Sequence, residues 1–379
     1  MAGILIIFHT GSNTGYAMTP LEKTFFKMAF SLTKNEDHIH FSFKNFNNGH
    51  PDSLPENFSN LIAIDNNHPE TLPKARDYIL QHKIDYAFCF DLQVSSDIGS
   101  MLRACNVKKI ISYWGATISG ENSGLKLLLK KIEVLLNRKK PDHFIFESEA
   151  MRFYAVQGRG IPKAMTSVIP TGIDIEKYQP ENRNKNLLNQ LFSIPEEAKV
   201  VFYSGHMERR KGVHVIIDAA IEIVEKRGQE NIYFLITGNK PGEEKDFLTQ
   251  LGNSKAAQKV IFGGYRTDLD KIMPSCDLGV IASTGWDSFP MSSLEMAACG
   301  LPLIVSDLQG LTETITEEVT GLKFPPGDSK KLAEHIIRLL TNHQEMQAFS
   351  LRARQRIIQS YSVDHQLDKL LSCCGKVFK

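Results

Sequence analysis

Short apolar segments alternate with helical patterns along the whole chain. The expected strands are GILIIF, HIHFSF, NLIAID, YAFCFD, KKIISYW, HFIFES and TSVIP in the first half, and KVVFYSG, IYFLITG, KVIFGG, LGVIAS, PLIVSD and GLKFPP in the second. Strands that alternate with helices in this way are typical of parallel sheets with helices on both faces. We therefore expect an α/β fold with one doubly wound domain in each half.

One polar, proline-bounded segment breaks this rhythm. It covers residues 180–199, PENRNKNLLNQLFSIPEEAK, and we place the domain junction there, with a first domain at 1–180 and a second at 181–357. The helical stretch after Ser329 is interrupted at QSYSVD, so residues 358–379 are expected to pack back on the first domain. A helical hairpin on the second domain is the alternative.

The composition is that of a globular protein with two cores. The chain has 379 residues, 42% of them hydrophobic and 23% charged, with a net charge of +1. The small net charge gives no overall positive field that would attract nucleic acid. An anionic partner would therefore have to bind at a local cluster of cations. The six cysteines lack the spacing of a zinc site, and no metal site is expected. Without a leader-like N-terminus or a run of about 18 apolar residues, the expected location is the cytoplasm.

Several familiar motifs are missing from the sequence. The glycine-rich dinucleotide fingerprint, the Walker A loop, the Gly-x-Ser-x-Gly elbow and His-Glu-x-x-His do not occur, which argues against dehydrogenases, P-loop NTPases, α/β-hydrolases and zincins. In open α/β sheets, ligands sit outside the carboxyl ends of the strands. The loops after the strands, facing a cleft between the two halves, are therefore the expected site.

The stretch GWDSFPMSSLEMAACG carries two acids around a strand-to-helix turn. Glu295 lies within an apolar helical pattern, where a carboxylate is costly to desolvate unless a partner occupies it. A solvated acid on a helix face is the alternative. Because the stretch follows a strand of the second domain, Asp287, the backbone of residues 289–292 and Glu295 are expected to face the same cleft.

Three other loops could bind an anionic ligand. Arg209, Arg210 and Lys211 precede a helix that begins near Gly212, which suggests a diphosphate clamp, with a solvated basic loop as the alternative. The loop FGGYRTD offers backbone amides to a nucleobase. The loop HTGSNTGYAM has Gly15 close to a helix N-terminus, where it could approach an anion or form an ordinary turn.

These segments together resemble the retaining glycosyltransferases of family 4. SGHMERRKG, FGGYRTDLDKIMPSCDL, DSFPMSSLE followed by MAACGLPLIVSD, and GLTETITEEVTGLKFPPGD occur in the family's order, with PDHFIFESEAMR and VIPTGIDIEKYQP before them. The resemblance implies the GT-B fold, in which two Rossmann-like domains face each other across a cleft. It makes residues 1–180 the acceptor-side domain and 181–357 the nucleotide-sugar-binding domain.

The resemblance also implies a reaction. A sugar would move from a nucleoside-diphosphate donor, UDP- or GDP-linked, to an acceptor hydroxyl with retention of configuration, in envelope, surface-glycan or glycolipid biosynthesis. No cofactor or metal would be required, since loop amides and cations neutralise the phosphates. A GT-B-fold nucleotide-sugar epimerase and a non-catalytic nucleotide-sugar-binding subunit are the alternatives.

Roles for individual residues follow from the same resemblance. Glu295 would hold the ribose hydroxyls, Asp287 would lie near the hydroxyls of the donor sugar, and Lys211 would stabilise the departing diphosphate. These three form the expected catalytic group. The implied donor-binding residues are Gly15, His206, Arg209, Arg210, Tyr265, Arg266, Phe289, Pro290, Met291, Ser292 and Glu295.

The chain departs from the family pattern at three positions. Asp287 stands where the family usually has glutamate, and His206 stands where an arginine commonly contacts the diphosphate. Trp114 occupies the place of a histidine near the reacting sugar. Its indole could stack on a sugar on the acceptor side or fill the core.

Residues 124–140, GLKLLLKKIEVLLNRKK, form a basic amphipathic pattern. Leucines recur at helical spacing, and six basic residues accompany one acid. Such a helix can rest on an anionic membrane surface, whereas a surface helix with its leucines in the core is the alternative. We expect peripheral attachment at the inner face of the membrane and a glycan or lipid-linked acceptor.

Overall fold

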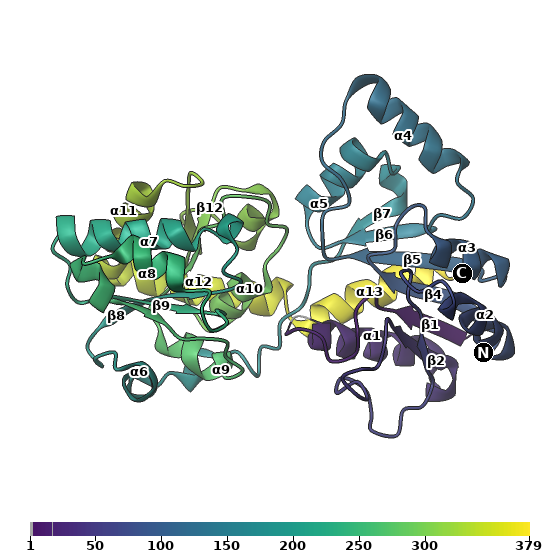
Figure 1. The fold of residues 1–379 in the computed structure, drawn as a ribbon, viewed down its shortest axis with the longest axis horizontal. Helices are drawn as coiled ribbons and strands as arrows, with labels where there is room; N and C mark the ends of the chain where they lie inside the picture. The colour runs from purple at the N-terminus through teal and green to yellow at the C-terminus, as the bar shows by residue number, and fades with distance from the viewer. Residues whose placement is uncertain (1–2, 17) are drawn as a thin grey trace. The chain divides into compact units, whose positions relative to one another are not determined.

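The computed structural model describes residues 3–16 and 18–379, which form two compact units (Figure 1). The N-terminal unit runs to Thr171 and also includes Val363–Lys379, and the C-terminal unit is Gly172–Ser362. The chain therefore leaves the N-terminal unit once and returns to it with its last segment.

A parallel seven-stranded sheet forms the centre of the N-terminal unit, in the order β3-β2-β1-β4-β5-β6-β7. Its strands are β1 (Gly3–Ile7), β2 (Ile39–Phe43), β3 (Leu61–Ala63), β4 (Ile84–Phe90), β5 (Lys109–Trp114), β6 (His143–Phe146) and β7 (Thr166–Val168). The chain winds outward from β1 in one direction and then from β4 in the other. This is the doubly wound topology expected from the alternating pattern.

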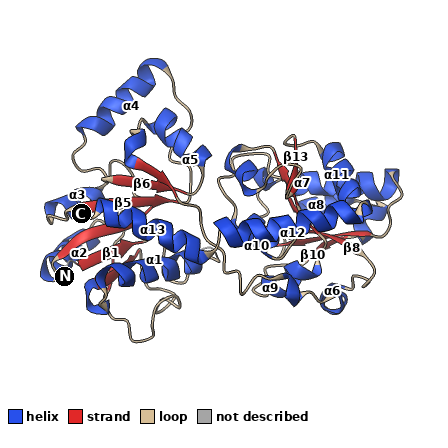
Figure 2. Ribbon diagram, turned by 180° about the vertical axis from the view of Figure 1, so that it is seen from behind, coloured by secondary structure: helices blue, strands red, loops and turns tan. Residues whose placement is uncertain are grey.

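Helices cover the two faces of this sheet (Figure 2). The helices of this unit are α1 (Met18–Thr33), α2 (Thr71–Gln81), α3 (Asp97–Ala104), α4 (Gly124–Leu136), α5 (Glu149–Tyr154) and α13 (Val363–Val377). Along β1, Ile4 and Ile6 join the core beneath α1 and α13, while Leu5 and Ile7 join the core beneath α2 and α3. Burial on both faces explains why this strand is a continuous apolar run rather than an alternating one.

The C-terminal unit repeats the architecture with six parallel strands in the order β10-β9-β8-β11-β12-β13. They are β8 (Lys199–Ser204), β9 (Ile232–Thr237), β10 (Val260–Phe262), β11 (Leu278–Ile281), β12 (Leu303–Ser306) and β13 (Gly321–Phe324). The helices are α6 (Lys185–Phe192), α7 (Val213–Ile221), α8 (Lys245–Leu251), α9 (Leu269–Ile272), α10 (Met291–Ala298), α11 (Ser329–Thr341) and α12 (His343–Ser360). The strand order reverses between β8 and β11, so the expectation of two parallel doubly wound sheets is confirmed.

The C-terminal helices divide between the two units. The helix α12 ends at Ser360, close to the interruption expected at QSYSVD, and α13 begins at Val363. Leu370 and Cys374 of α13 are fully buried in the core of the N-terminal unit. Gln366 also donates a hydrogen bond to the hydroxyl of Tyr113 on β5, at 3.2 Å. The last helix is thus a structural part of the first sheet domain.

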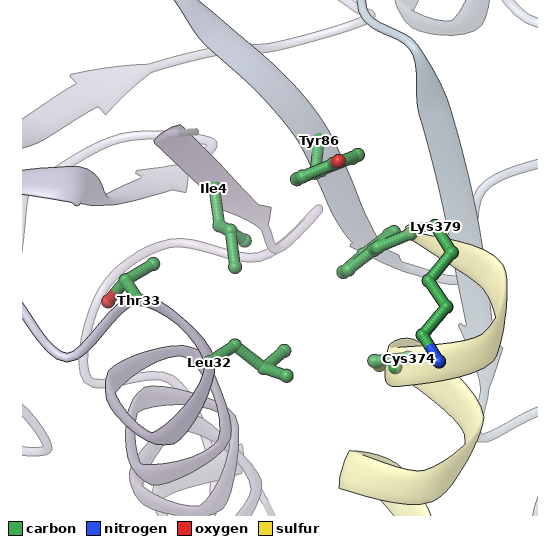
Figure 3. A pocket seen from close by; sticks show the side chains of 8 residues that line it. Ile4, Leu32, Thr33, Tyr86, Cys374 and Lys379 are labelled. Carbon is green, nitrogen blue, oxygen red and sulfur yellow. The ribbon is translucent and has the colours of Figure 1, made fainter. Parts of the chain in front are cut away.

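A cavity of about 280 Å³ lies at the N-terminal edge of the first sheet (Figure 3). It is lined by Ile4, Leu32, Thr33, Tyr86, Cys374, Gly375, Phe378 and Lys379. The lining is mainly apolar and comes from the start of β1 and the ends of α1 and α13. The strands point their carboxyl ends to the opposite edge, so this cavity is separate from the loops expected to bind ligand.

Candidate functional site

The candidate site of the C-terminal unit lies where the strand order reverses, at the carboxyl ends of β8 and β11. Gly212 has φ +74°, and a Cβ atom there would lie 1.7 Å from the carbonyl oxygen of Ala282. The N–H of Thr284 donates to the carbonyl of Arg210 at 2.7 Å. Close backbone approach, which only glycine permits here, therefore holds the basic loop against the loop that carries Asp287.

An ion pair joins these two loops. Lys211 Nζ lies 3.0 Å from Asp287 Oδ2, and Ser283 Oγ donates to the same oxygen at 2.7 Å. Asp287 is only 5% exposed. The pairing and the hydroxyl compensate for desolvation of the carboxylate, and they hold a half-buried lysine at the switch point of the sheet. Two residues that the sequence separates by 76 positions are thus in direct contact.

Glu295 is buried within α10 and is not a solvated acid on a helix face. Its side chain is 2% exposed, and burial raises its pKa to about 7. A hydrogen bond from Tyr178 opposes that rise in pKa. The segment bearing Tyr178 is held by Arg354, whose guanidinium donates to the carbonyls of Tyr178 and Ile175 at 2.6 and 2.9 Å. The carboxyl group is therefore fixed in position, with a pKa raised toward neutral pH.

The helix α10 begins shortly after Asp287, at Met291. Its N-cap residue is Pro290, whose side chain makes no capping hydrogen bond to the first turn. Met291 and Ser292 are half-buried, and Phe289 is buried, with its ring centroid 5.7 Å from that of Tyr361. First-turn N–H groups and the positive end of the helix dipole favour an anion.

The cations of the basic loop are mostly exposed. Arg210 donates to the carbonyl of Trp286 at 3.0 Å and pairs with Glu208 at 2.7 Å, so its guanidinium also ties the loop in place. His206 and Arg209 are exposed. The hydroxyl of Tyr203 donates to the carbonyl of His206 at 2.9 Å, which fixes the start of this loop.

Tyr265 and Arg266 follow β10, where glycines bring three loops together. Gly264 has φ +72°, and its N–H donates to the side-chain oxygen of Asn239 at 2.9 Å. Tyr265 is 62% exposed. Arg266 binds both carboxylate oxygens of Asp268, so its guanidinium is engaged within its own loop. A donor-binding role for Arg266 stays a prediction.

Two of the expected residues belong to the N-terminal unit. Gly15 has φ +81°, and no described atom lies within 4 Å of a Cβ built on it. Its loop is anchored by Ser12, which donates to the carbonyl of Gly49 at 2.8 Å. Trp114 is 2% exposed at the end of β5, so its ring fills the interior of this unit. Contact of either residue with a substrate stays a prediction.

Two acids of the N-terminal unit, the half-buried Asp91 and the buried Glu147, were not expected from the sequence. Asp91 and Glu147 directly follow β4 and β6, and burial raises their pKa values to about 7 and about 8. Asp91 has φ +56° and accepts a hydrogen bond from the N–H of Gly115 at 3.0 Å. Glu147 accepts from the hydroxyl of Thr171 at 2.6 Å. In the sequence, each of these acids directly follows an apolar strand segment, and this position could have identified the pair.

Solved structures share the whole architecture. A glycosyltransferase from Rickettsia africae aligns with a TM-score of 0.83 at 16% identity, over 100% of this chain and 99% of that one. Anabaena HepE in complex with UDP and glucose aligns with a TM-score of 0.77 at 20% identity, over 99% and 100%. The fold is that of the GT-B glycosyltransferases.

Part of the sequence is also similar to a family model and to curated proteins. Residues 184–356 match the model described as "Glycosyl transferases group 1". A UDP-Gal:alpha-D-GlcNAc-diphosphoundecaprenol alpha-1,3-galactosyltransferase of Escherichia coli is 25% identical over 54% of this chain and 52% of its own length. A D-inositol 3-phosphate glycosyltransferase of Corynebacterium urealyticum is 27% identical over 61% and 55%. The chain spans about half the length of the curated relatives it matches.

Among residues 3–16 and 18–379, no three His, Cys, Asp or Glu side chains gather closely enough to hold a metal ion. In the same described residues, no helix is both long and apolar enough to cross a membrane.

Proposed function

We propose that this protein is a retaining glycosyltransferase that moves a sugar from a nucleoside-diphosphate donor to an acceptor hydroxyl. The observation that carries the proposal is the ion pair between the half-buried Lys211 and the buried Asp287, at 3.0 Å, beside the reversal of strand order in the C-terminal unit. It supplies a fixed cation and a fixed carboxylate within the region that matches the glycosyltransferase family. Both are groups that a departing diphosphate and a sugar hydroxyl would engage.

The donor would be bound by groups of different charge. Glu295, in its ionised form, would accept hydrogen bonds from the two ribose hydroxyls. The diphosphate would lie against the N-terminus of α10, with Lys211 and Arg209 as counter-charges. We propose a UDP- or GDP-linked sugar, a choice supported by the UDP in the name of the Escherichia coli relative and in the HepE complex.

Catalysis would then rest on electrostatics. Negative charge grows on the diphosphate as the glycosidic bond breaks, and a preorganised Lys211 stabilises that charge more than it stabilises the bound donor. Asp287 would orient the sugar through its hydroxyls while its partner Lys211 faces the phosphates. Because protein cations would neutralise the leaving group, we propose that the reaction needs no metal.

The acceptor is proposed to be a glycan or a lipid-linked sugar in envelope or surface-glycan biosynthesis. Support comes from relatives named for diphosphoundecaprenol acceptors, including one of Campylobacter jejuni that is 27% identical over 59% of this chain. The enzyme would work in the cytoplasm, at the inner face of the membrane that holds such acceptors.

The decisive experiment measures donor binding and donor cleavage together. Thermal unfolding is followed with a panel of UDP-, GDP- and ADP-sugars, and the donor that stabilises the protein is then tested for transfer with chelator present. We expect stabilisation by one base only, and release of nucleoside diphosphate that survives chelation. Loss of transfer that Mn²⁺ or Mg²⁺ restores contradicts the metal-free scheme. Binding without any cleavage points to a non-catalytic subunit, and conversion of the donor without acceptor points to an epimerase.

A further inference from the structure

The most exposed apolar surface of the N-terminal unit is one face of α4, at the periphery of that unit (Figure 1). The face consists of Leu125, Leu128, Leu129, Ile132, Leu135 and Leu136, which are 42–75% exposed. Their spacing of three and four residues places them on a single side of the helix. The alternative that these leucines fill the core is therefore wrong, since Val134 is the one α4 residue described as buried.

The opposite side of α4 is fixed to its own unit. Val134 is fully buried, and a Cβ built on Gly160 would lie 2.8 Å from the backbone nitrogen of Lys131. Asn137 at the end of the helix donates to the carbonyl of Val94 at 2.8 Å. Packing on the opposite side of α4 therefore holds the leucine face outward. The helix itself stays attached to its domain.

Most of the charged side chains around the leucine face are positive. Lys126 and Lys131 lie on the two flanks of the apolar arc and are exposed, and Arg138 and Lys139 follow the helix end. The single acid of α4, Glu133, is bound by Arg159 at 3.1 and 2.5 Å. The local field at this surface is therefore positive, with its one negative charge already neutralised.

We infer that α4 is a membrane-docking helix that lies in the plane of a bilayer rich in anionic phospholipids. The leucine face would enter the boundary between headgroups and acyl chains, while the flanking lysines extend to lipid phosphates. A second copy of this chain is a poor occupant, because pairing two such faces would bring two sets of unneutralised cations together. The inference adds a specific contact to the membrane location in the proposed function, but it does not depend on the enzyme being active.

The test uses the full chain and vesicles without donor or acceptor. Sedimentation is measured at low salt with vesicles of phosphatidylcholine containing about one quarter phosphatidylglycerol, and with phosphatidylcholine alone. We expect binding to the anionic vesicles that falls as salt rises. The Leu129→Glu/Leu136→Glu variant should partition at least about tenfold more weakly, since it removes two apolar anchors. The Lys126→Glu/Lys131→Glu variant should lose a similar factor on anionic vesicles only.

The matched control is Leu351→Glu, at a residue of α12 that is 61% exposed. It should bind vesicles as the wild type does. Stabilisation by the nucleotide-sugar should be unchanged in all variants, which shows that they fold and separates this test from that of the proposed function. Equal vesicle binding by the wild type and the leucine variant would overturn the inference. So would a wild-type dimer in solution that the leucine variant converts to a monomer without any change in vesicle binding.

Discussion

Lys211 and Asp287 form an ion pair at 3.0 Å, and Ser283 shares the same carboxylate oxygen. The pair joins the loop after β8 to the loop after β11, so it contributes to folding as well as to the proposed chemistry. Its two contributions can be separated, because stability needs matched partners whereas electrostatic catalysis needs the cation itself.

Replacing Lys211 with methionine should reduce both stability and activity. Asp287 would remain buried without its counter-ion, and we expect the free energy of unfolding to fall by about 3 kcal/mol. The double variant Lys211→Met/Asp287→Asn should recover most of that loss in denaturant unfolding. Transfer should stay at least about 100-fold below wild type in both variants. Recovery of transfer in the double variant would remove Lys211 from the mechanism.

Donor affinity should depend on pH through Glu295. Burial raises the pKa of this carboxyl group to about 7. In the proposed function, its ionised form accepts hydrogen bonds from ribose. Affinity for the nucleotide-sugar should therefore rise as pH increases from 6 to 8, by up to about tenfold per unit below the pKa. Calorimetric titration across this range measures the slope. The Glu295→Gln variant should bind weakly and show no such slope.

Tyr178 provides a second check on the same group. Its hydrogen bond to Glu295 lowers the pKa of that carboxyl group, against the effect of burial. Tyr178→Phe should therefore move the pH dependence of donor affinity to higher pH and keep its shape. An unshifted profile would show that another group controls the titration.

Stability should also depend on pH through Asp91 and Glu147. Their native pKa values are raised to about 7 and about 8, so the folded chain keeps protons that the unfolded chain has released. Their stabilising contribution is complete below about pH 4 and is lost as pH rises through the native values, a change on the order of several kcal/mol. Glu147→Gln should make the free energy of unfolding fall less between pH 5 and 9. The exposed Glu121→Gln control should follow the wild type.

Two glycines with similar φ angles should respond differently to alanine. At Gly212 an added Cβ would overlap the carbonyl oxygen of Ala282, whereas at Gly15 no described atom lies within 4 Å. Gly15→Ala should cost about 1 kcal/mol of unfolding free energy from left-handed strain alone. Gly212→Ala should cost more than about 2 kcal/mol and should weaken donor binding as the two loops separate. Equal losses measured by denaturant unfolding would contradict the close contact.

The topology could be predicted because burial on both faces gives each central strand a continuous apolar run. All thirteen expected strands form, in two parallel sheets. The loops of the candidate site could be located for a related reason, since parallel strands bring their carboxyl ends to one edge and the residues that follow them are known from the chain order. Lys211 and Asp287 were expected in one site on that basis, and the structure shows them in contact.

What the sequence by itself determined is therefore the repeating local pattern: which segments are strands, which loops follow them, and which loops carry charge. Only the tertiary structure decided which side of an amphipathic helix is covered and which acids lose their solvent. The leucines of α4 and the acid Glu295 both lie within apolar sequence patterns of helical spacing. In the structure, however, the leucines are exposed and the acid is buried. Burial depends on packing partners that are distant in the chain, such as Gly160 beside α4 and Tyr178 beside Glu295, and local spacing carries no information about them.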